Sequence, residues 1–197
     1  MSDHLVLAKL CQQSYGDSSL PVQTISGVVF AVIGYTIVFR GSESEQDWMR
    51  DFEALPVIHP QLGKLARGFA EGTQQTFAWL VKNGPNNPIF TGHSLGAAHA
   101  AIIASLYQAN GYLWQELVTF GCPRPGYSEL RSILQKSRKP LTAYRNGDDI
   151  VPTIPKAFLW WAYRSYTEWT RIGKGDDEFS DHMIQNYINA LENNLTA

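Results

Sequence analysis

The sequence predicts an α/β fold, in which a mostly parallel central sheet is covered by helices on both faces. Two observations lead to this prediction. Apolar runs of strand length alternate with segments in which apolar residues recur at helical spacing, and such alternation indicates crossover connections between parallel strands. The chain of 197 residues, 44% of them hydrophobic and 17% charged, is also long enough for one sizeable core. We therefore expect a single domain that spans residues 1–197.

A helix and a pair of strands are predicted at the start of the chain. Residues 5–15 carry apolar side chains close to helical spacing, and the run that begins at Gly16 ends the pattern. Residues 27–40 are dense in β-branched and aromatic side chains on both faces, as in the strands of a buried sheet. Gly34 and Tyr35 interrupt this run, so we expect two strands joined by a hairpin turn.

Two further helices are predicted before the middle of the chain. Residues 61–81 show a long helical pattern, which the Lys-Asn-Gly-Pro run at 82–85 ends. Residues 46–55 form a shorter amphipathic helix, whose apolar stripe consists of Trp48, Met49, Phe52 and Leu55.

Strands and helices continue to alternate through the rest of the chain. A strand at residues 88–91 leads into a turn with two glycines. The later predicted elements are a helix over residues 96–108, a strand over 117–120, a helix over 127–134, a strand over 141–145, a strand over 161–169 and a helix over 181–195. In the last helix we expect four side chains to face the core: Met183, Tyr187, Ile188 and Leu191.

Charge and hydropathy exclude several classes of partner. The formal net charge of -2 provides no basic field for a nucleic acid. No apolar run reaches the roughly 18 residues of a membrane span, and residues 1–13 lack the positive cluster of a secretory signal. We therefore expect no nucleic acid partner, no transmembrane segment and a cytoplasmic location, with export by another route as the alternative. Cys11 and Cys122 are expected to be free and buried.

The turn after residues 88–91 carries a G-x-S-x-G motif, Gly92-His-Ser-Leu-Gly96. In a nucleophile elbow the serine is raised on a sharp strand-to-helix turn, and glycines flank it because a side chain there would collide with the strand or the helix. The N–H of Leu95 would then point from the helix N-terminus toward the oxygen of a carbonyl group attacked by Ser94. The alternative is a structural turn in which Ser94 caps the following helix.

A nucleophilic serine needs a base, and we expect that base to be His182. A serine hydroxyl reacts poorly at neutral pH unless a histidine accepts its proton and an acid orients the histidine. Of the 5 histidines, His93 is expected to point to the opposite side and His99 to be packed in the next helix. Two others lie in the N-terminus and in a proline-flanked loop, whereas His182 immediately precedes an apolar helical pattern.

The acid is expected just after the strand at residues 141–145. Asp149 and its neighbour Asp148 both follow the C-terminal end of that strand, where open parallel sheets gather their active sites. The chain order Ser94, then aspartate, then His182 is the order of the α/β-hydrolase arrangement.

Several separated motifs of this chain match those of one family. They are Ser14-Tyr-Gly-Asp17, Val38-Phe-Arg-Gly-Ser42, Asp47-Trp48, Arg67-Gly-Phe69, Gly92-His-Ser-Leu-Gly96, Phe120-Gly-Cys-Pro-Arg124, Asp149-Ile-Val-Pro152 and His182-Met-Ile-Gln-Asn-Tyr187. Over nearly its whole length the chain resembles the class 3 lipase family of α/β-hydrolases, which includes filamentous-fungal triacylglycerol lipases and feruloyl esterases. The chain is short for that family, and it has Ala97 where a third glycine is common.

The resemblance assigns roles to individual residues. It implies that Asp149, rather than Asp148, is the acid and that His182 is the base. It also implies an oxyanion hole made of the backbone N–H groups of Ser42 and Leu95. An N-cap on the helix predicted after it is the alternative role for Ser42.

Two aromatic segments have two interpretations each. Residues 46–55 fall where the family often carries a mobile lid, so Trp48, Met49 and Phe52 either shield an apolar site or make fixed core contacts. Residues 158–161 either line an acyl pocket or belong to the core.

The residues and the resemblance together predict a serine carboxylic-ester hydrolase that acts through an acyl-enzyme on Ser94, with no metal or cofactor. The expected partners are a lipid or small ester substrate and, transiently, a lipid interface. Acylglycerols are the leading substrates. The alternatives are acyl esters of phospholipids, feruloyl or other aryl esters, acyl transfer to an alcohol, and a non-catalytic binding module.

Overall fold

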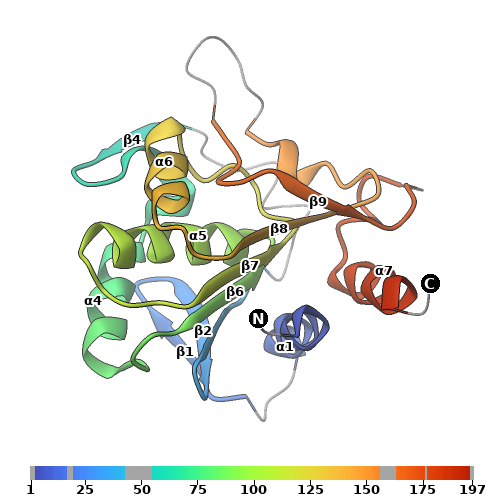
Figure 1. Ribbon diagram of the computed structural model, residues 1–197, viewed down its shortest axis with the longest axis horizontal. Coiled ribbons are helices and arrows are strands. Elements are labelled where there is room, and N and C mark those ends of the chain that lie inside the picture. Colours follow the sequence, from blue (N-terminus) through green and yellow to red (C-terminus); the bar gives the residue numbers. More distant parts are fainter. Residues whose placement is uncertain (1–2, 17–19, 43–54, 156–162, 176, 196–197) are drawn as a thin grey trace.

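The computed structural model describes residues 3–16, 20–42, 55–155, 163–175 and 177–195 (Figure 1). The predicted lid or pocket residues Trp48, Met49 and Phe52 lie outside these ranges, and so does the aromatic run 158–161. None of the described helices combines the length and the apolar character that crossing a membrane requires.

A seven-stranded sheet forms the centre of the structure. In spatial order its strands are β1 (Val22–Ile25), β2 (Val28–Ile33), β3 (Thr36–Phe39), β6 (Ile89–His93), β7 (Glu116–Phe120), β8 (Leu141–Asn146) and β9 (Trp169–Ile172). The first two pairings are antiparallel, whereas β3, β6, β7, β8 and β9 run parallel. The carboxyl ends of β6, β7 and β8 therefore meet at one edge of the sheet.

Helices cover both faces of this sheet, so the predicted fold class is confirmed (Figure 1). On one face α1 (His4–Gly16) packs against α7 (Ile184–Leu195). The other face carries α3 (Arg67–Ala70), α4 (Thr73–Asn83), α5 (Leu95–Ala109) and α6 (Ser128–Lys136). Helix α5 is buried along almost its whole length, because its alanines allow a close approach to the sheet.

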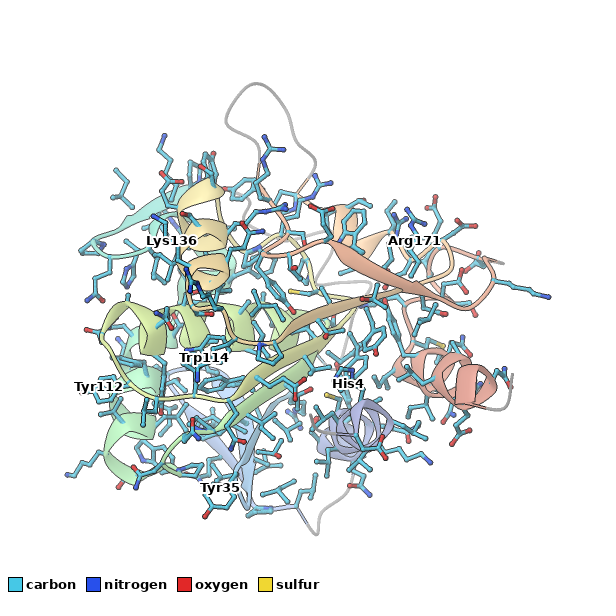
Figure 2. The ribbon with its side chains drawn as sticks, in the orientation of Figure 1. His4, Tyr35, Tyr112, Trp114, Lys136 and Arg171 are labelled. Atoms are coloured by element: carbon cyan, nitrogen blue, oxygen red, sulfur yellow. The ribbon has the colours of Figure 1, made fainter. Side chains whose placement is uncertain are left out.

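Each face of the sheet encloses its own apolar cluster. The cluster beneath α5 contains the fully buried Phe39, Phe90 and Trp114, and Figure 2 shows Trp114 inside the molecule. The smaller cluster beneath α1 and α7 contains Cys11 and Tyr187. Burial in this cluster raises the pKa of the Cys11 thiol to about 12, so that the thiol stays protonated. Like Cys11, the second cysteine is free and buried, as predicted.

The predicted hairpin at residues 27–40 is confirmed. The last paired residues of β2 and β3 are Ile33 and Thr36, so the turn between the strands consists of two residues, 34 and 35. Gly34 has a φ of +58°, which glycine adopts without steric cost at the first central position of a tight hairpin turn.

The long helix predicted over residues 61–81 is confirmed only in its second half, where α4 lies, and is wrong before it. A separate two-stranded sheet of β4 (Pro56–His59) and β5 (Gly63–Ala66) precedes two short helices, α3 and α4. Gly63 and Gly72 both have positive φ values, of +75° and +71°, and each interrupts helical geometry. A Cβ atom at Gly72 would also lie 2.1 Å from the carbonyl oxygen of Ser26, so the chain needs glycine there.

Two elements near the C-terminus begin later than predicted. The strand expected over residues 161–169 lies at β9, Trp169–Ile172. The last helix begins at Ile184, because the Asp177 carboxylate accepts N–H groups of the turn before it. Met183, expected to face inward, is 55% exposed, whereas Tyr187, Ile188 and Leu191 are buried as predicted.

Candidate active site

Ser94 stands on a strained turn between a strand and a helix. Strand β6 ends at His93 and α5 begins at Leu95, and Ser94 between them has φ 56° and ψ -128°. Such a conformation costs a residue other than glycine roughly 1–3 kcal/mol, and surrounding contacts must enforce it. The N–H of Ser94 donates to the carbonyl oxygen of Phe120 at the end of β7, at 3.1 Å. The serine side chain makes no capping hydrogen bond to α5, which argues against the structural alternative.

The two flanking glycines are required by close backbone contacts. A Cβ atom at Gly92 would lie 2.5 Å from the carbonyl carbon of Gly96, on the first turn of α5. A Cβ atom at Gly96 would lie 2.2 Å from the carbonyl oxygen of Phe39, on the neighbouring strand β3. The strand and helix can therefore approach closely enough to form the elbow only where both side chains are absent.

The structure brings Ser94, His182 and Asp149 into one hydrogen-bonded chain. The Oγ of Ser94 lies 2.9 Å from Nε2 of His182, and Nδ1 of His182 lies 2.8 Å from Oδ2 of Asp149. In a neutral imidazole, Nδ1–H donates to the carboxylate, so that Nε2 is free to accept the serine proton. The neighbouring Asp148 is exposed, and its N–H donates to Asp181. Asp149, not Asp148, therefore faces the histidine.

Asp149 is a fully buried carboxylate with three hydrogen-bond donors. Oδ1 accepts the N–H of Val151 at 2.8 Å, and Oδ2 accepts the hydroxyl of Tyr187 at 2.5 Å besides the histidine. Burial, and next the charge of Asp149, raise the pKa of Tyr187 well above its usual value, so that its hydroxyl stays protonated and donates. A buried carboxylate without such partners would be costly. The aspartate is thus both stabilised and fixed in position.

His93 contacts His182, a neighbour that the sequence did not reveal. Its Nε2 lies 2.7 Å from the carbonyl oxygen of His182, and its Nδ1 lies 2.8 Å from the hydroxyl of Tyr15. The two imidazole rings have centroids 4.8 Å apart. Burial, and next the charge of His182, lower the pKa of His93 well below its usual value. The neutral ring therefore donates from Nε2 to His182 and accepts at Nδ1 from Tyr15.

Of the two expected oxyanion donors, Leu95 directly follows Ser94, and Ser42 follows a glycine that lies against Ser94. Leu95 is the first residue of α5, so its N–H has no partner within the helix. Gly41 and Ser42 follow β3, and a Cβ atom at Gly41 would lie 3.2 Å from Cβ of Ser94. The same atom would lie 2.9 Å from the backbone carbonyl oxygen of His93, which is closer than a Cβ atom can come, so the chain needs glycine there. The backbone that leads to Ser42 thus runs against Ser94.

Gly121 is a further residue that the site requires. It follows β7 with a φ of +59°, and a Cβ atom there would lie 2.7 Å from Cε1 of His182 and 3.0 Å from Oδ2 of Asp149. The absence of a side chain leaves the space that the histidine and aspartate occupy. Two features of the sequence could have identified Gly121. It directly follows a predicted strand, and it belongs to the Phe120–Arg124 motif that matches the family.

Within the part of the chain that the structure describes, no three His, Cys, Asp or Glu side chains gather in a way that would hold a metal ion. The arrangement of serine, histidine and aspartate needs none for nucleophilic attack on a carbonyl carbon. The sheet topology, the strained serine and the chain order of the three residues are those of the α/β-hydrolase fold with a serine at its elbow.

Comparison with known proteins gives the family. The model of the family described as "Lipase (class 3)" matches residues 36–159, and the chain belongs to this family. Lipase of Rhizomucor miehei is 32% identical over 167 residues, which are 74% of this chain and 46% of that protein. Secreted mono- and diacylglycerol lipase 1 of Fusarium solani is 30% identical over 122 residues, 62% of this chain and 34% of that one.

The fold is also that of a solved member of the family. The native Rhizomucor miehei lipase propeptide complex superimposes with a TM-score of 0.67 and 25% identity, covering 86% of this chain and 67% of that chain. The chain spans less than half of the length of the two relatives named above.

Proposed function

We propose that this protein is a serine carboxylic-ester hydrolase that cleaves acyl esters of glycerol through an acyl-enzyme on Ser94. The observation that carries the proposal is the hydrogen-bonded chain from Ser94 through His182 to Asp149 on a strained elbow. Membership of the class 3 lipase family supports it. The family does not by itself identify the acyl ester that this chain cleaves.

The acylation step follows from the positions of these atoms. Nε2 of His182 removes the proton from Oγ of Ser94 as the oxygen attacks the ester carbonyl carbon. Asp149 stabilises the imidazolium that forms, and the N–H groups of Leu95 and Ser42 stabilise the negative oxygen. The imidazolium then gives its proton to the departing alkoxide, which leaves as the alcohol.

Water completes the cycle by the same path. His182 accepts a proton from the water molecule that attacks the acyl-enzyme, and a second oxyanion forms in the same place. Collapse of this intermediate breaks the bond to Oγ and releases the carboxylic acid, while Ser94 recovers its proton from His182.

Acylglycerols are the substrates that we propose, because the names of both curated relatives describe lipases, one of them acting on mono- and diacylglycerols. The protein would meet such substrates at a lipid interface through transient contact. We further propose that Ser94, Asp149 and His182 are the catalytic residues and that the chain forms one domain.

The test compares wild type with Ser94→Ala. Hydrolysis of a chain-length series of p-nitrophenyl esters and of mono-, di- and triacylglycerols is measured for both proteins, and a fluorescent organophosphonate reports the reactive serine. Wild type should hydrolyse glycerol esters and take up the label, whereas the variant should do neither. Equal hydrolysis by both proteins would remove Ser94 from the mechanism. Labelling of wild type without hydrolysis of any glycerol ester would overturn the proposed substrate but keep the reactive serine.

A further inference from the structure

A surface pocket of about 160 Å³, whose described lining does not include Ser94, lies between the loop after β7, helix α6 and the segment that leads into β9. We call it the arginine pocket. Three arginines, three hydroxyl residues, one acid and one tryptophan line it: Arg124, Arg131, Arg164, Tyr163, Ser165, Thr167, Glu168 and Trp169. The whole chain has a formal net charge of -2, so this local excess of cations does not follow from composition.

The positive charges of the arginine pocket are only partly compensated. Glu168 is the one carboxylate among the described residues that line it, and it contacts the guanidinium of Arg131. Within the described ranges, neither Arg124 nor Arg164 forms an ion pair with a carboxylate. Arg124 and Arg164 line the same pocket, and burial, followed by the charges of Arg164 and Arg145, lowers the pKa of Arg124. The side chain of Arg124 donates to the carbonyl oxygen of Pro155 at 3.3 Å, a contact that brings no negative charge.

An anion of suitable shape would relieve this repulsion. A guanidinium group offers planar, paired N–H donors that match the oxygens of phosphate or carboxylate. The hydroxyl groups of Ser165 and Thr167 line the same cavity and add uncharged donors. Liquid water occupies about 30 Å³ per molecule, so the cavity has room for a group with the size of a phosphate ester.

The arginine pocket is connected to the catalytic edge of the sheet by two of its neighbours. Arg145 lies over the ring of Trp169, which also lines the pocket, at 5.0 Å from the ring centroid. The Nε of Arg145 donates to the carbonyl oxygen of Asp149 at 2.9 Å. On the other side, Arg124 lies three residues after Gly121, which abuts the histidine of the triad.

We propose that the arginine pocket binds a phosphate group. The two sources of that group are a phosphate-bearing acylglycerol, bound as substrate, and free phosphate. The first source rests on the proposed function, because it requires that the protein hydrolyse glycerol esters. Binding of phosphate itself does not depend on hydrolysis.

The first arm of the test measures binding of inorganic phosphate by calorimetry at constant ionic strength, which holds non-specific screening fixed. The probe is titrated into wild type, Arg164→Ala, Glu168→Gln and Arg171→Ala. Arg171 is an exposed arginine on β9 that does not line the pocket, so its variant removes the same charge nearby (Figure 2). We expect Arg164→Ala to weaken binding about tenfold, since a charge-assisted hydrogen bond is lost.

The two other variants test whether phosphate binds in the arginine pocket and not elsewhere on the surface. Glu168→Gln should tighten phosphate binding about threefold, because the competing carboxylate is removed, and Arg171→Ala should stay within about twofold of wild type. No phosphate binding by wild type, or equal losses in Arg164→Ala and Arg171→Ala, would overturn the proposal. Circular dichroism spectra of all four proteins check that each is folded.

The second arm identifies the source of the phosphate. Hydrolysis of monooleoyl glycerol and of its glycerol phosphate analogue is compared in the same detergent micelles. If the substrate supplies the phosphate, Arg164→Ala lowers the ratio of kcat/KM for the phosphate ester over the neutral ester about tenfold. If that ratio is unchanged while phosphate binding is weakened, the pocket is a site for free phosphate. Failure of hydrolysis with both esters would contradict the proposed function and leave the result of the first arm standing.

Discussion

Asp149 receives three hydrogen bonds, and the one from Tyr187 can be removed without changing the shape of the site. In Tyr187→Phe, Oδ2 keeps only the imidazole as donor, and the buried carboxylate loses part of its stabilisation. We expect kcat to fall roughly tenfold, with little change in KM, and the free energy of unfolding to fall by about 1–3 kcal/mol. Steady-state kinetics on a soluble ester and urea denaturation measure the two effects.

The control for this prediction is Tyr35→Phe. Tyr35 is 65% exposed in the β2–β3 turn, so its hydroxyl is in water, and the variant should match wild type in both measurements. Wild-type kcat in Tyr187→Phe would show that its hydrogen bond to Asp149 does not position the aspartate.

His93 holds the backbone of His182 and packs against its ring, so we predict that it positions His182, the proposed base. His93→Leu removes both hydrogen bonds of the ring and lets the base shift, and a shift of about 1 Å can cost on the order of a hundredfold in rate. We expect kcat to fall by about that factor while KM changes little. His93→Gln retains a side-chain N–H that can donate to the same carbonyl oxygen and should restore a large part of kcat.

A purely structural role for His93 would give a different result. Both variants would then lose thermal stability in parallel with activity, and His93→Gln would show no preferential recovery of kcat. The comparison of kcat with the melting temperature of each variant separates these outcomes.

The site could be predicted from sequence where the chain order and the motif carry the information. Ser94, Asp149 and His182 stand in the α/β-hydrolase order, and the structure joins them by hydrogen bonds. The contact of His93 with His182 could not be predicted, because it joins residues 89 positions apart through a backbone carbonyl group. Tyr187 was predicted only to face the core, since spacing says nothing about which polar atom its hydroxyl reaches.

The turn between β6 and α5 requires glycine at position 96, and a substitution there tests this requirement. Gly96→Ala places a Cβ atom 2.2 Å from the carbonyl oxygen of Phe39, and that oxygen belongs to the sheet and cannot move away cheaply. We expect the free energy of unfolding to fall by about 3 kcal/mol, and activity to fall with it. Chemical denaturation and ester hydrolysis measure both. Gly16→Ala is the matched control because its Cβ atom meets nothing within 4 Å, and an equal loss in both variants would contradict the explanation.

Helices and strands were predicted correctly where the spacing of apolar residues continued without a glycine of positive φ. The apolar run of β6 and the alanine-rich α5 were found within one or two residues of their limits. The helix over residues 61–81 was wrong in its first half because helical spacing in α4 was extended backward over a hairpin, and Gly63 and Gly72 were not recognised as positive-φ positions. A positive φ depends on contacts with distant segments, such as Ser26, which a sequence pattern does not contain.

At the scale of the whole molecule, the helices on both faces of the sheet bury histidines, and burial favours their neutral form. His93 lies under α1, and His99 lies inside α5, where burial lowers the pKa of His99 to about 4. In the unfolded chain a histidine titrates near 6.5, so between that pH and the folded pKa the unfolded state binds more protons. Stability is therefore fully present above pH 6.5 and is lost as the pH falls toward 4. The shift of His99 corresponds to a loss of about 3 kcal/mol.

His99→Gln tests this dependence, because glutamine has a similar size and does not titrate. The free energy of unfolding is measured by urea denaturation at pH 7.5 and at pH 4.5 for wild type and variant. We expect the loss between the two pH values to be smaller in His99→Gln by about 2 kcal/mol, since most of the transition from 6.5 to about 4 falls in this interval. His59→Gln, which changes a half-buried histidine at the end of β4 and outside the apolar clusters, should lose as much stability between the two pH values as wild type. An equal loss in all three proteins would mean that His99 accepts a proton in the folded protein without destabilising α5, and the acid sensitivity would then have to come from other groups.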